Sequence, residues 1–162
     1  FKNVQYFLFN QNSMLSPFDE IKKKFDYKDL HLIHQIDEIF RMNFSFTNFG
    51  SSIQYLDNYE ILLEKITNNT KHIFFSGTHL YNSSEKKFEK NTIVKQVNVL
   101  PKINFNYFFN RQNFFNILKK KDYELIFEKK NLTDNVNYDN FNNYLKNLEY
   151  SDFLFTKKTT VI

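Results

Sequence analysis

The first half of the sequence alternates short apolar runs with amphipathic segments. The runs have the length and pattern of buried strands, and the segments that follow the first three runs have apolar positions at helical spacing, the first after Pro17. This alternation predicts an α/β protein, with a parallel sheet whose strands are joined by helical crossovers. The predicted strands are Val4–Phe9, Leu30–Ile33, Phe44–Phe49 and His72–Ser76, and the predicted helices are Phe18–Phe25, Gln35–Met42 and Asn58–Ile66.

The third predicted strand leads into a helix through a turn that begins at Gly50. Open α/β sheets bind ligands beyond the carboxyl ends of their strands, so this turn is a candidate ligand site. Gly50 and Gly77 are the only glycines of the chain. This sequence therefore contains no glycine-rich loop of the kind that brings backbone N–H groups against a phosphate.

The pattern changes after Gly77. The predicted elements are a loop over 79–91, an extended arm over 92–99, an irregular aromatic stretch over 101–109, a helix over 111–121, a strand over 123–128, an asparagine-rich stretch over 131–150 with a weak helix over 141–148, and a final strand over 152–157. The two strands of this half are expected to pair as an antiparallel hairpin.

Composition excludes several kinds of chemistry. The 162 residues fit one domain, and the absence of cysteine excludes disulfides and thiolate chemistry. No apolar run reaches the about 18 residues that a membrane-spanning helix needs. Lysine carries most of the basic charge, and the runs at 22–24 and 119–121 fall at predicted helix ends, where they complement the helix dipole. Nucleic-acid binding is an alternative, but the aromatic residues follow apolar strand patterns that indicate a core.

Three stretches of the sequence resemble a known family. They are Gly50–Asp57, Val94–Val97 around Gln96, and Asn106–Phe114. Together they resemble the class I S-adenosylmethionine-dependent methyltransferases, and more closely the methyltransferases encoded in bacterial capsule and O-antigen gene clusters. The resemblance covers nearly the whole chain. It implies a Rossmann-like, mostly parallel sheet with a C-terminal antiparallel hairpin.

The sheet order of that family is 3-2-1-4-5-7-6. The resemblance implies that residues 1–162 are a single, N-terminally truncated domain that supplies strands two to seven and lacks the first strand and its glycine-rich loop. It also implies S-adenosylmethionine as the cofactor, a small-molecule or glycan-precursor substrate, and a cytoplasmic location. Asn10 stands where the family has an acid for the ribose hydroxyls, and Asn43 where it has an aspartate, so cofactor binding is expected to be weakened.

The cofactor site that the resemblance implies follows the ends of three strands. His34 would contact the adenine, with a partly buried, hydrogen-bonded histidine as the alternative. Gln54 is expected to line the pocket and Tyr55 to pack beneath the helix. No metal site is predicted, because His31 and His34 would face opposite sides of a strand. The implied cofactor-binding residues are Asn10, Gln11, His34, Gln35, Phe49, Gly50, Ser51 and Gln54.

Methyl transfer to a hydroxyl needs a base that removes the hydroxyl proton. His79 is the catalytic candidate because it follows the fourth predicted strand, and a surface-loop histidine is the alternative. Thr78 and Gln96 are candidates for contact with the acceptor substrate, and for Gln96 a strand-edge hydrogen bond is the alternative. Asn110 is expected to cap the helix that follows it.

The sequence therefore predicts methyl transfer from S-adenosylmethionine to a sugar or polysaccharide precursor, with this truncated form inactive. The first alternative is a degenerate methyltransferase-like module that binds a partner, in which another chain covers exposed strand edges. The second alternative is a basic nucleic-acid-binding domain, whose affinity would fall steeply with salt.

Overall fold

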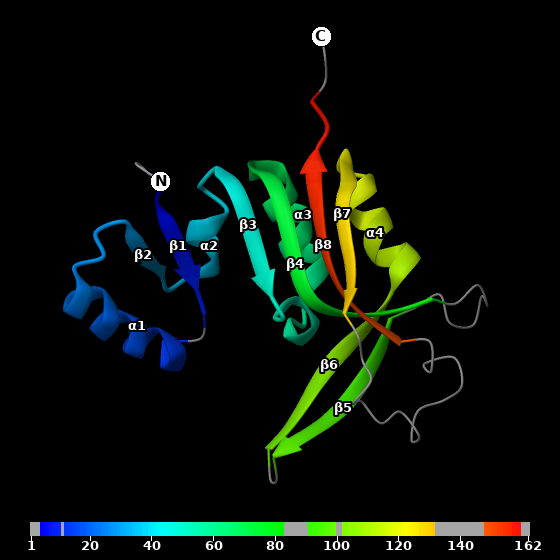
Figure 1. The fold of residues 1–162 in the computed structure, drawn as a ribbon, viewed down its shortest axis with the longest axis horizontal. Coiled ribbons are helices and arrows are strands. Elements are labelled where there is room, and N and C mark those ends of the chain that lie inside the picture. Colours follow the sequence, from blue (N-terminus) through cyan, green and yellow to red (C-terminus); the bar gives the residue numbers. More distant parts are fainter. Residues whose placement is uncertain (1–3, 11, 83–90, 100–101, 132–147, 160–162) are drawn as a thin grey trace. The chain divides into compact units, whose positions relative to one another are not determined.

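The computed structural model describes residues 4–10, 12–82, 91–99, 102–131 and 148–159. The chain divides into two compact units, Phe1–Asn43 and Phe44–Ile162 (Figure 1). The elements are β1 (Tyr6–Phe9), α1 (Asn12–Phe25), β2 (Leu30–Ile33), α2 (Ile36–Ile39), β3 (Phe44–Gly50), the 3₁₀ helix η1 (Ile53–Tyr55), α3 (Tyr59–Asn69), β4 (Thr70–Tyr81), β5 (Thr92–Val99), β6 (Lys102–Asn110), α4 (Arg111–Lys119), β7 (Tyr123–Asn131) and β8 (Leu148–Lys157).

The first unit contains a two-stranded parallel sheet. β1 pairs with β2 from Tyr6 opposite Leu30 to Phe9 opposite Ile33. Among the described side chains of this unit, only Leu15 and Ile33 are buried. The helix before β2 is longer than predicted: α1 begins at Asn12 and contains Pro17, which the sequence had suggested as a helix start. The prediction followed the preference of proline for the first turn of a helix. In this helix Pro17 lies further along, where it has no N–H to donate to the preceding turn.

The second unit contains a larger sheet in the order β3-β4-β8-β7. β3 runs parallel to β4, from Phe44 opposite Thr70 to Gly50 opposite Ser76. β8 runs antiparallel to both β4 and β7, so the predicted C-terminal antiparallel hairpin is confirmed. The chain thus has the α/β architecture, with helices joining parallel strands, that the sequence predicts.

A ribbon of two strands extends from the end of this sheet (Figure 1). β5 pairs antiparallel with β6, and β6 runs parallel to β4 at only two positions, Leu80 opposite Phe109 and Tyr81 opposite Asn110. The prediction of an irregular stretch over 101–109 is therefore wrong for the strand residues. These residues form a strand because they pair with β5, and a local sequence pattern does not reveal a partner strand.

β4 is longer than predicted. Instead of ending at Ser76 it continues to Tyr81, with an irregular register between Phe75 and Thr78. The predicted loop is wrong for residues 79–81, because these pair with residues 148–150 of β8. The weak helix predicted over 141–148 lies outside the described residues except for Leu148, which begins β8.

Helices α3 and α4 lie on one face of the larger sheet and contact each other (Figure 1). Phe75 of β4 is fully buried and packs against Phe114 of α4, with ring centroids 5.3 Å apart, and against Phe153 of β8, at 5.0 Å. Leu63 and Ile66 of α3 are also buried. This aromatic and aliphatic layer is the core of the second unit.

The carboxyl end of α3 is completed by side chains from the C-terminal hairpin. The last turn of α3 has no basic residue of its own. The Thr67 carbonyl accepts a hydrogen bond from Lys157 Nζ at 2.9 Å, and the Tyr123 hydroxyl donates to the carbonyl of Thr70. These donors supply partners for carbonyls that a helix cannot satisfy internally. Among the described residues, no helix combines the length and apolarity needed to cross a membrane.

Candidate functional site

The carboxyl end of β3 is joined directly to the middle of β4. Ser51, with φ of 47°, donates its backbone N–H to the Ser76 carbonyl at 2.9 Å. Gly77, with φ of 56°, lies so close that a Cβ there would be 2.4 Å from Ser51 Oγ. A glycine is thus required by both the backbone conformation and the close approach. Gly50 carries no such requirement, because a Cβ there would make only ordinary contacts at 3.9 Å and beyond.

Gln54 locks this junction. It lies in η1, is 1% exposed, and donates from Nε2 to the carbonyls of Ser51 at 3.1 Å and Gly77 at 3.3 Å. Asp152 of β8 accepts from the Gly77 N–H at 2.7 Å. Gln54 is therefore buried between two backbone segments, with its Oε1 unpartnered among the described residues. Tyr55, expected to pack beneath the helix, is instead 40% exposed.

His79 lies in β4 and not in a loop. It is 5% exposed and sits between the rings of Phe108, with centroids 4.7 Å apart, and Tyr150, at 4.3 Å. Burial lowers the pKa of His79 to about 4, against the opposing effect of the Asn106 side chain. The imidazole is therefore neutral at pH 7, and its Nδ1 has no hydrogen-bond partner among the described residues. A neutral ring can accept a proton, but a substrate reaches it only if the covering residues move.

A chain of polar side chains leads from the surface toward His79. The Tyr55 hydroxyl donates to Gln96 Oε1 at 3.1 Å, and Asn106 Nδ2 donates to the same oxygen at 2.6 Å. Asn106 is 2% exposed, and its Oδ1 has no partner among the described residues. The sequence had suggested no role for the Asn106 side chain. The signal that could have found it is the period-two alternation of residues 104–109, which places Asn104, Asn106 and Phe108 on one face of a strand.

Thr78 also lies away from solvent. It is fully buried opposite Ser151 of β8, and neither hydroxyl has a partner among the described residues. Phe49 is 6% exposed and stacks on Phe75 at 5.1 Å, so it belongs to the core. Asn110 caps α4 as predicted, since its side chain accepts from the Asn113 N–H at 3.1 Å.

The remaining predicted cofactor residues belong to the first unit. Asn10 follows β1, and His34 follows β2, directly after the paired residues Phe9 and Ile33. Asn10, His34 and Gln35 are exposed, and the Gln35 N–H is held by Glu38 Oε1 at 3.0 Å at the start of α2. Gln11 lies outside the described residues.

The polar groups at the strand ends partly fit S-adenosylmethionine. Exposed amide and imidazole groups at Asn10 and His34 suit the hydrogen-bonding edges of a nucleoside. The methionine end of the cofactor carries both an ammonium and a carboxylate. With only two glycines, this sequence provides no glycine-rich turn to bind that end of the cofactor. The space beside Gly77 is already filled by the side chain of Ser51.

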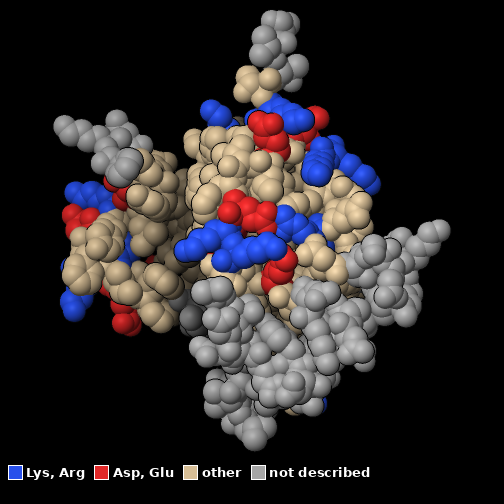
Figure 2. Space-filling model, turned by 45° about the vertical axis from the view of Figure 1, so that its right-hand side comes forward, with Lys and Arg blue, Asp and Glu red and all other residues tan. Residues whose placement is uncertain are grey.

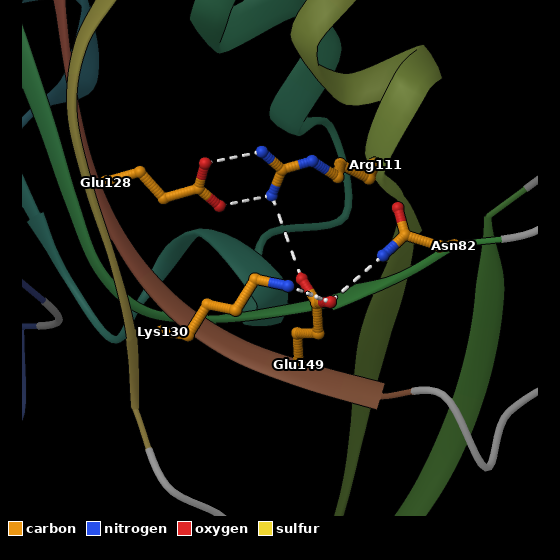
Figure 3. Close-up of polar contacts among 5 residues, drawn as sticks. All are labelled: Asn82, Arg111, Glu128, Lys130 and Glu149. Carbon is orange, nitrogen blue, oxygen red and sulfur yellow. Dashed lines mark hydrogen bonds and ion pairs between the residues drawn. The ribbon is translucent and has the colours of Figure 1, made fainter.

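An ion-pair network fixes the start of α4 to the hairpin (Figure 3). Arg111 makes a bidentate ion pair with the carboxylate of Glu128, in which Nη2 lies 2.6 Å from Oε2. Its Nη1 also lies 3.8 Å from Glu149 Oε2. Lys130 Nζ is 2.6 Å from Glu149 Oε1, and Asn82 donates to the same oxygen at 3.1 Å. Arg111 lowers the pKa of the Glu128 carboxyl. Figure 2 shows basic and acidic side chains side by side on one face of the molecule. Arg111 and Lys130 are both paired with carboxylates.

No protein-family model matches the sequence, and no curated protein matches it. Solved structures do. The N-terminal domain of EvdMO1 with SAH bound matches 98% of this chain with a TM-score of 0.64 and 11% identity, and this chain spans 66% of that domain. An S-adenosylmethionine-dependent methyltransferase from Clostridium acetobutylicum ATCC 824 matches 96% of this chain and 76% of its own length, with a TM-score of 0.60 and 11% identity.

A third match is the glycopeptide N-methyltransferase MtfA complexed with SAH. It covers 94% of this chain and 73% of its own length, with a TM-score of 0.60 and 10% identity. At identities this low, the matches show a shared fold alone. The fold of this chain is that of the class I S-adenosylmethionine-dependent methyltransferases, as the sequence resemblance implied.

Proposed function

We propose that this chain is part of a cytoplasmic methyltransferase that transfers the methyl group of S-adenosylmethionine to a sugar or polysaccharide precursor. The observation that carries the proposal is the hydrogen-bonded junction of Ser51, Gln54 and Gly77 after β3, in a fold shared with an SAH-bound domain. A structure of the same EvdMO1 domain in the presence of SAH and D-fucose supports a sugar acceptor.

In this proposal the residues divide into two groups. Asn10, His34 and Gln35 hydrogen-bond the nucleoside, while Ser51 shapes the edge of the second unit. Once the residues that cover this part of β4 move, His79 removes the proton of the acceptor, and Thr78 and Gln96 help to orient the acceptor. When bound, the cofactor supplies an electrophilic methyl group, and the chain supplies position and proton transfer.

We further propose that residues 1–162 are most of a single domain that needs one more strand. Among the described residues, β1 pairs only with β2, and β3 pairs only with β4. Each therefore has one edge along which no described strand is paired. A strand that ends in an acidic, glycine-rich turn would occupy such an edge and would also receive the methionine end of the cofactor. Residues 1–162 alone are then inactive.

Isothermal titration with S-adenosylmethionine and SAH tests the proposal. We expect little or no binding by residues 1–162, and binding by a longer form of the protein that includes residues preceding Phe1. In the longer form, Gln54→Ala should weaken binding, whereas Gln112→Ala, an exposed residue of α4, should not. A longer form that binds neither compound would overturn the assignment.

The open strand edges also favour a second candidate, a methyltransferase-like module that binds another protein chain by strand addition. The same titration separates the two candidates. The partner-binding module predicts that the longer form remains unable to bind the cofactor.

A further inference from the structure

The ribbon formed by β5 and β6 has two unlike faces. Residues directly opposite each other in an antiparallel pair have their side chains on the same face. One face carries amide side chains, among them Gln96 and Asn106, which hydrogen-bond each other. The other face is called here the Phe105 face. Its described side chains are Ile93, Lys95, Ile103, Phe105 and Tyr107.

The Phe105 face is turned to solvent. Phe105 is 63% exposed and Ile93 is 61% exposed, and Ile103 is exposed as well. An antiparallel sheet with one face in water normally directs its apolar side chains to the core and its polar side chains outward. This ribbon does the reverse, because it buries Asn106 and exposes Phe105. Adjacent exposed apolar side chains of this kind indicate an interaction surface.

The charge on the outer part of the Phe105 face is positive. Lys95 is exposed directly opposite Phe105. The sequence contains no aspartate or glutamate over residues 90–121. Asp57 and Glu60 line a cavity with Tyr107, where the ribbon joins the sheet. The outer part of the face therefore combines apolar side chains with a cation, and these carboxylates lie at its base.

This combination favours a surface of anionic lipids over two other partners. A two-fold contact between copies of this chain would place the Phe105 face against itself, and the outer part of that face offers Lys95 no carboxylate. Single-stranded nucleic acid would suit Lys95 and Phe105, but Ile93 and Ile103 have no ring on which a base can stack. Apolar side chains enter the headgroup boundary of a bilayer, and a neighbouring lysine keeps its ammonium group among the phosphates.

We propose that the Phe105 face binds the surface of a bilayer that contains anionic lipids, with Ile103 and Phe105 inserted and Lys95 at the headgroups. The ribbon extends from the end of the sheet, so its outer part reaches such a surface without unfolding the core (Figure 1). The contact is peripheral, because only side chains of the ribbon enter the lipid. This inference goes beyond the proposed function and does not depend on the binding of S-adenosylmethionine.

Fluorescence tests where the lipid contact lies. The chain contains no tryptophan, so Phe105→Trp introduces a single reporter. On addition of vesicles of phosphatidylcholine mixed with phosphatidylglycerol, its emission should shift to the blue, and brominated lipid should quench it. The matched control is Phe127→Trp, since Phe127 is an exposed phenylalanine of β7. The emission of this control should change little.

Vesicle cosedimentation tests what drives the contact. Phe105→Ser should weaken binding about tenfold or more, because the variant loses the transfer of a phenylalanine side chain out of water. Lys95→Glu should weaken binding about fivefold or more on vesicles with phosphatidylglycerol. It should have little effect on vesicles of phosphatidylcholine alone. Lys71→Glu makes the same change in net charge at an exposed position of β4 and should leave binding nearly unchanged.

Three outcomes would overturn the proposal. The first is wild-type binding to vesicles in folded Phe105→Ser, or in Ile103→Ser if circular dichroism shows that Phe105→Ser does not fold. The second is a blue shift of Phe105→Trp that requires only a higher protein concentration, which would indicate a second copy of the chain. The third is a change in emission on addition of an oligonucleotide but not of vesicles, which would indicate nucleic acid.

Discussion

The two units of this chain bury apolar side chains to very different extents. In Phe44–Ile162, helices and strands enclose a layer that includes Phe75, Phe114 and Phe153, all fully buried. In Phe1–Asn43, Tyr6 is 58% exposed. A two-stranded sheet is marginal in water without further apolar contacts. The contrast teaches that the same alternation of strand and helix yields a stable unit only where both the sheet and the helices find partners.

The largest effect should come from truncating an aromatic side chain in each unit. Phe75→Ala removes a ring that contacts Phe49, Phe114 and Phe153, and should cost about 3–5 kcal/mol of unfolding free energy. Phe7→Ala removes a 37%-exposed ring that stacks on His31, and should cost less than about 1 kcal/mol. Urea unfolding followed by circular dichroism measures both. Equal losses would contradict the contrast between the units.

Acidification should destabilise the second unit through His79. The folded pKa of about 4 lies below the ordinary value of 6.5, so the unfolded chain binds more protons between these values. Stability should therefore fall as the pH drops from about 6.5 to about 4, by on the order of 3 kcal/mol. His79→Phe should remove this part of the pH dependence. Amide hydrogen exchange should locate the effect in the second unit, and a wild-type curve that matches the variant would refute it.

The ion-pair network should contribute a smaller amount. Arg111→Ala leaves Glu128 without its two-fold partner and should cost about 2 kcal/mol at neutral pH. Because Arg111 holds the folded pKa of Glu128 down, this contribution should be present at neutral pH and lost as the pH falls through that lowered pKa. Arg41→Ala, an exposed position of the first unit, is the control and should change stability by less than about 0.5 kcal/mol. Thermal unfolding at pH 7 and at low pH measures these losses of stability. A loss in Arg111→Ala that is the same at both pH values would contradict the expectation.

The smallest effects concern backbone conformation. Gly77→Ala should cost about 1–2 kcal/mol, because φ is positive and the added Cβ meets Ser51, whereas Gly50→Ala should be nearly neutral. In the first unit, Asp26 has φ of 50°, so Asp26→Gly should stabilise by less than about 1 kcal/mol. Melting temperatures compare the three variants. If Gly50→Ala lowers the melting temperature as much as Gly77→Ala does, then the special requirement for glycine at position 77 is wrong.

The elements that local patterns control were predictable. β3, α3 and the strands of the C-terminal hairpin follow from apolar periodicity, and Asn110 follows from capping chemistry. The second half of β4 was not predictable in this way. Gly77 and Thr78 look like the end of a strand, and pairing with β8, and with β6 at its last two residues, continues the strand to Tyr81. Likewise β6 is ordered by β5, a partner that its own residues do not specify.

The candidate site was predictable in part. Ser51 and Gln54 were expected at the ligand edge, and the structure brings both to the junction with Gly77. The link from Tyr55 through Gln96 to Asn106 was not foreseen, because it joins three segments whose register is set by β5 and β6. Side-chain partners of this kind follow from tertiary pairing, which a local sequence pattern does not contain.

The hydrogen bonds that close α3 bear on how this protein is made. The amine of Lys157 reaches the carbonyl of Thr67 across 90 positions of chain. A ribosome therefore synthesises the helix long before the residue that completes its end, and contacts of such separation form late in folding. A translation product that stops before β8 would leave this helix and its strand without partners, as a substrate for chaperones and proteases.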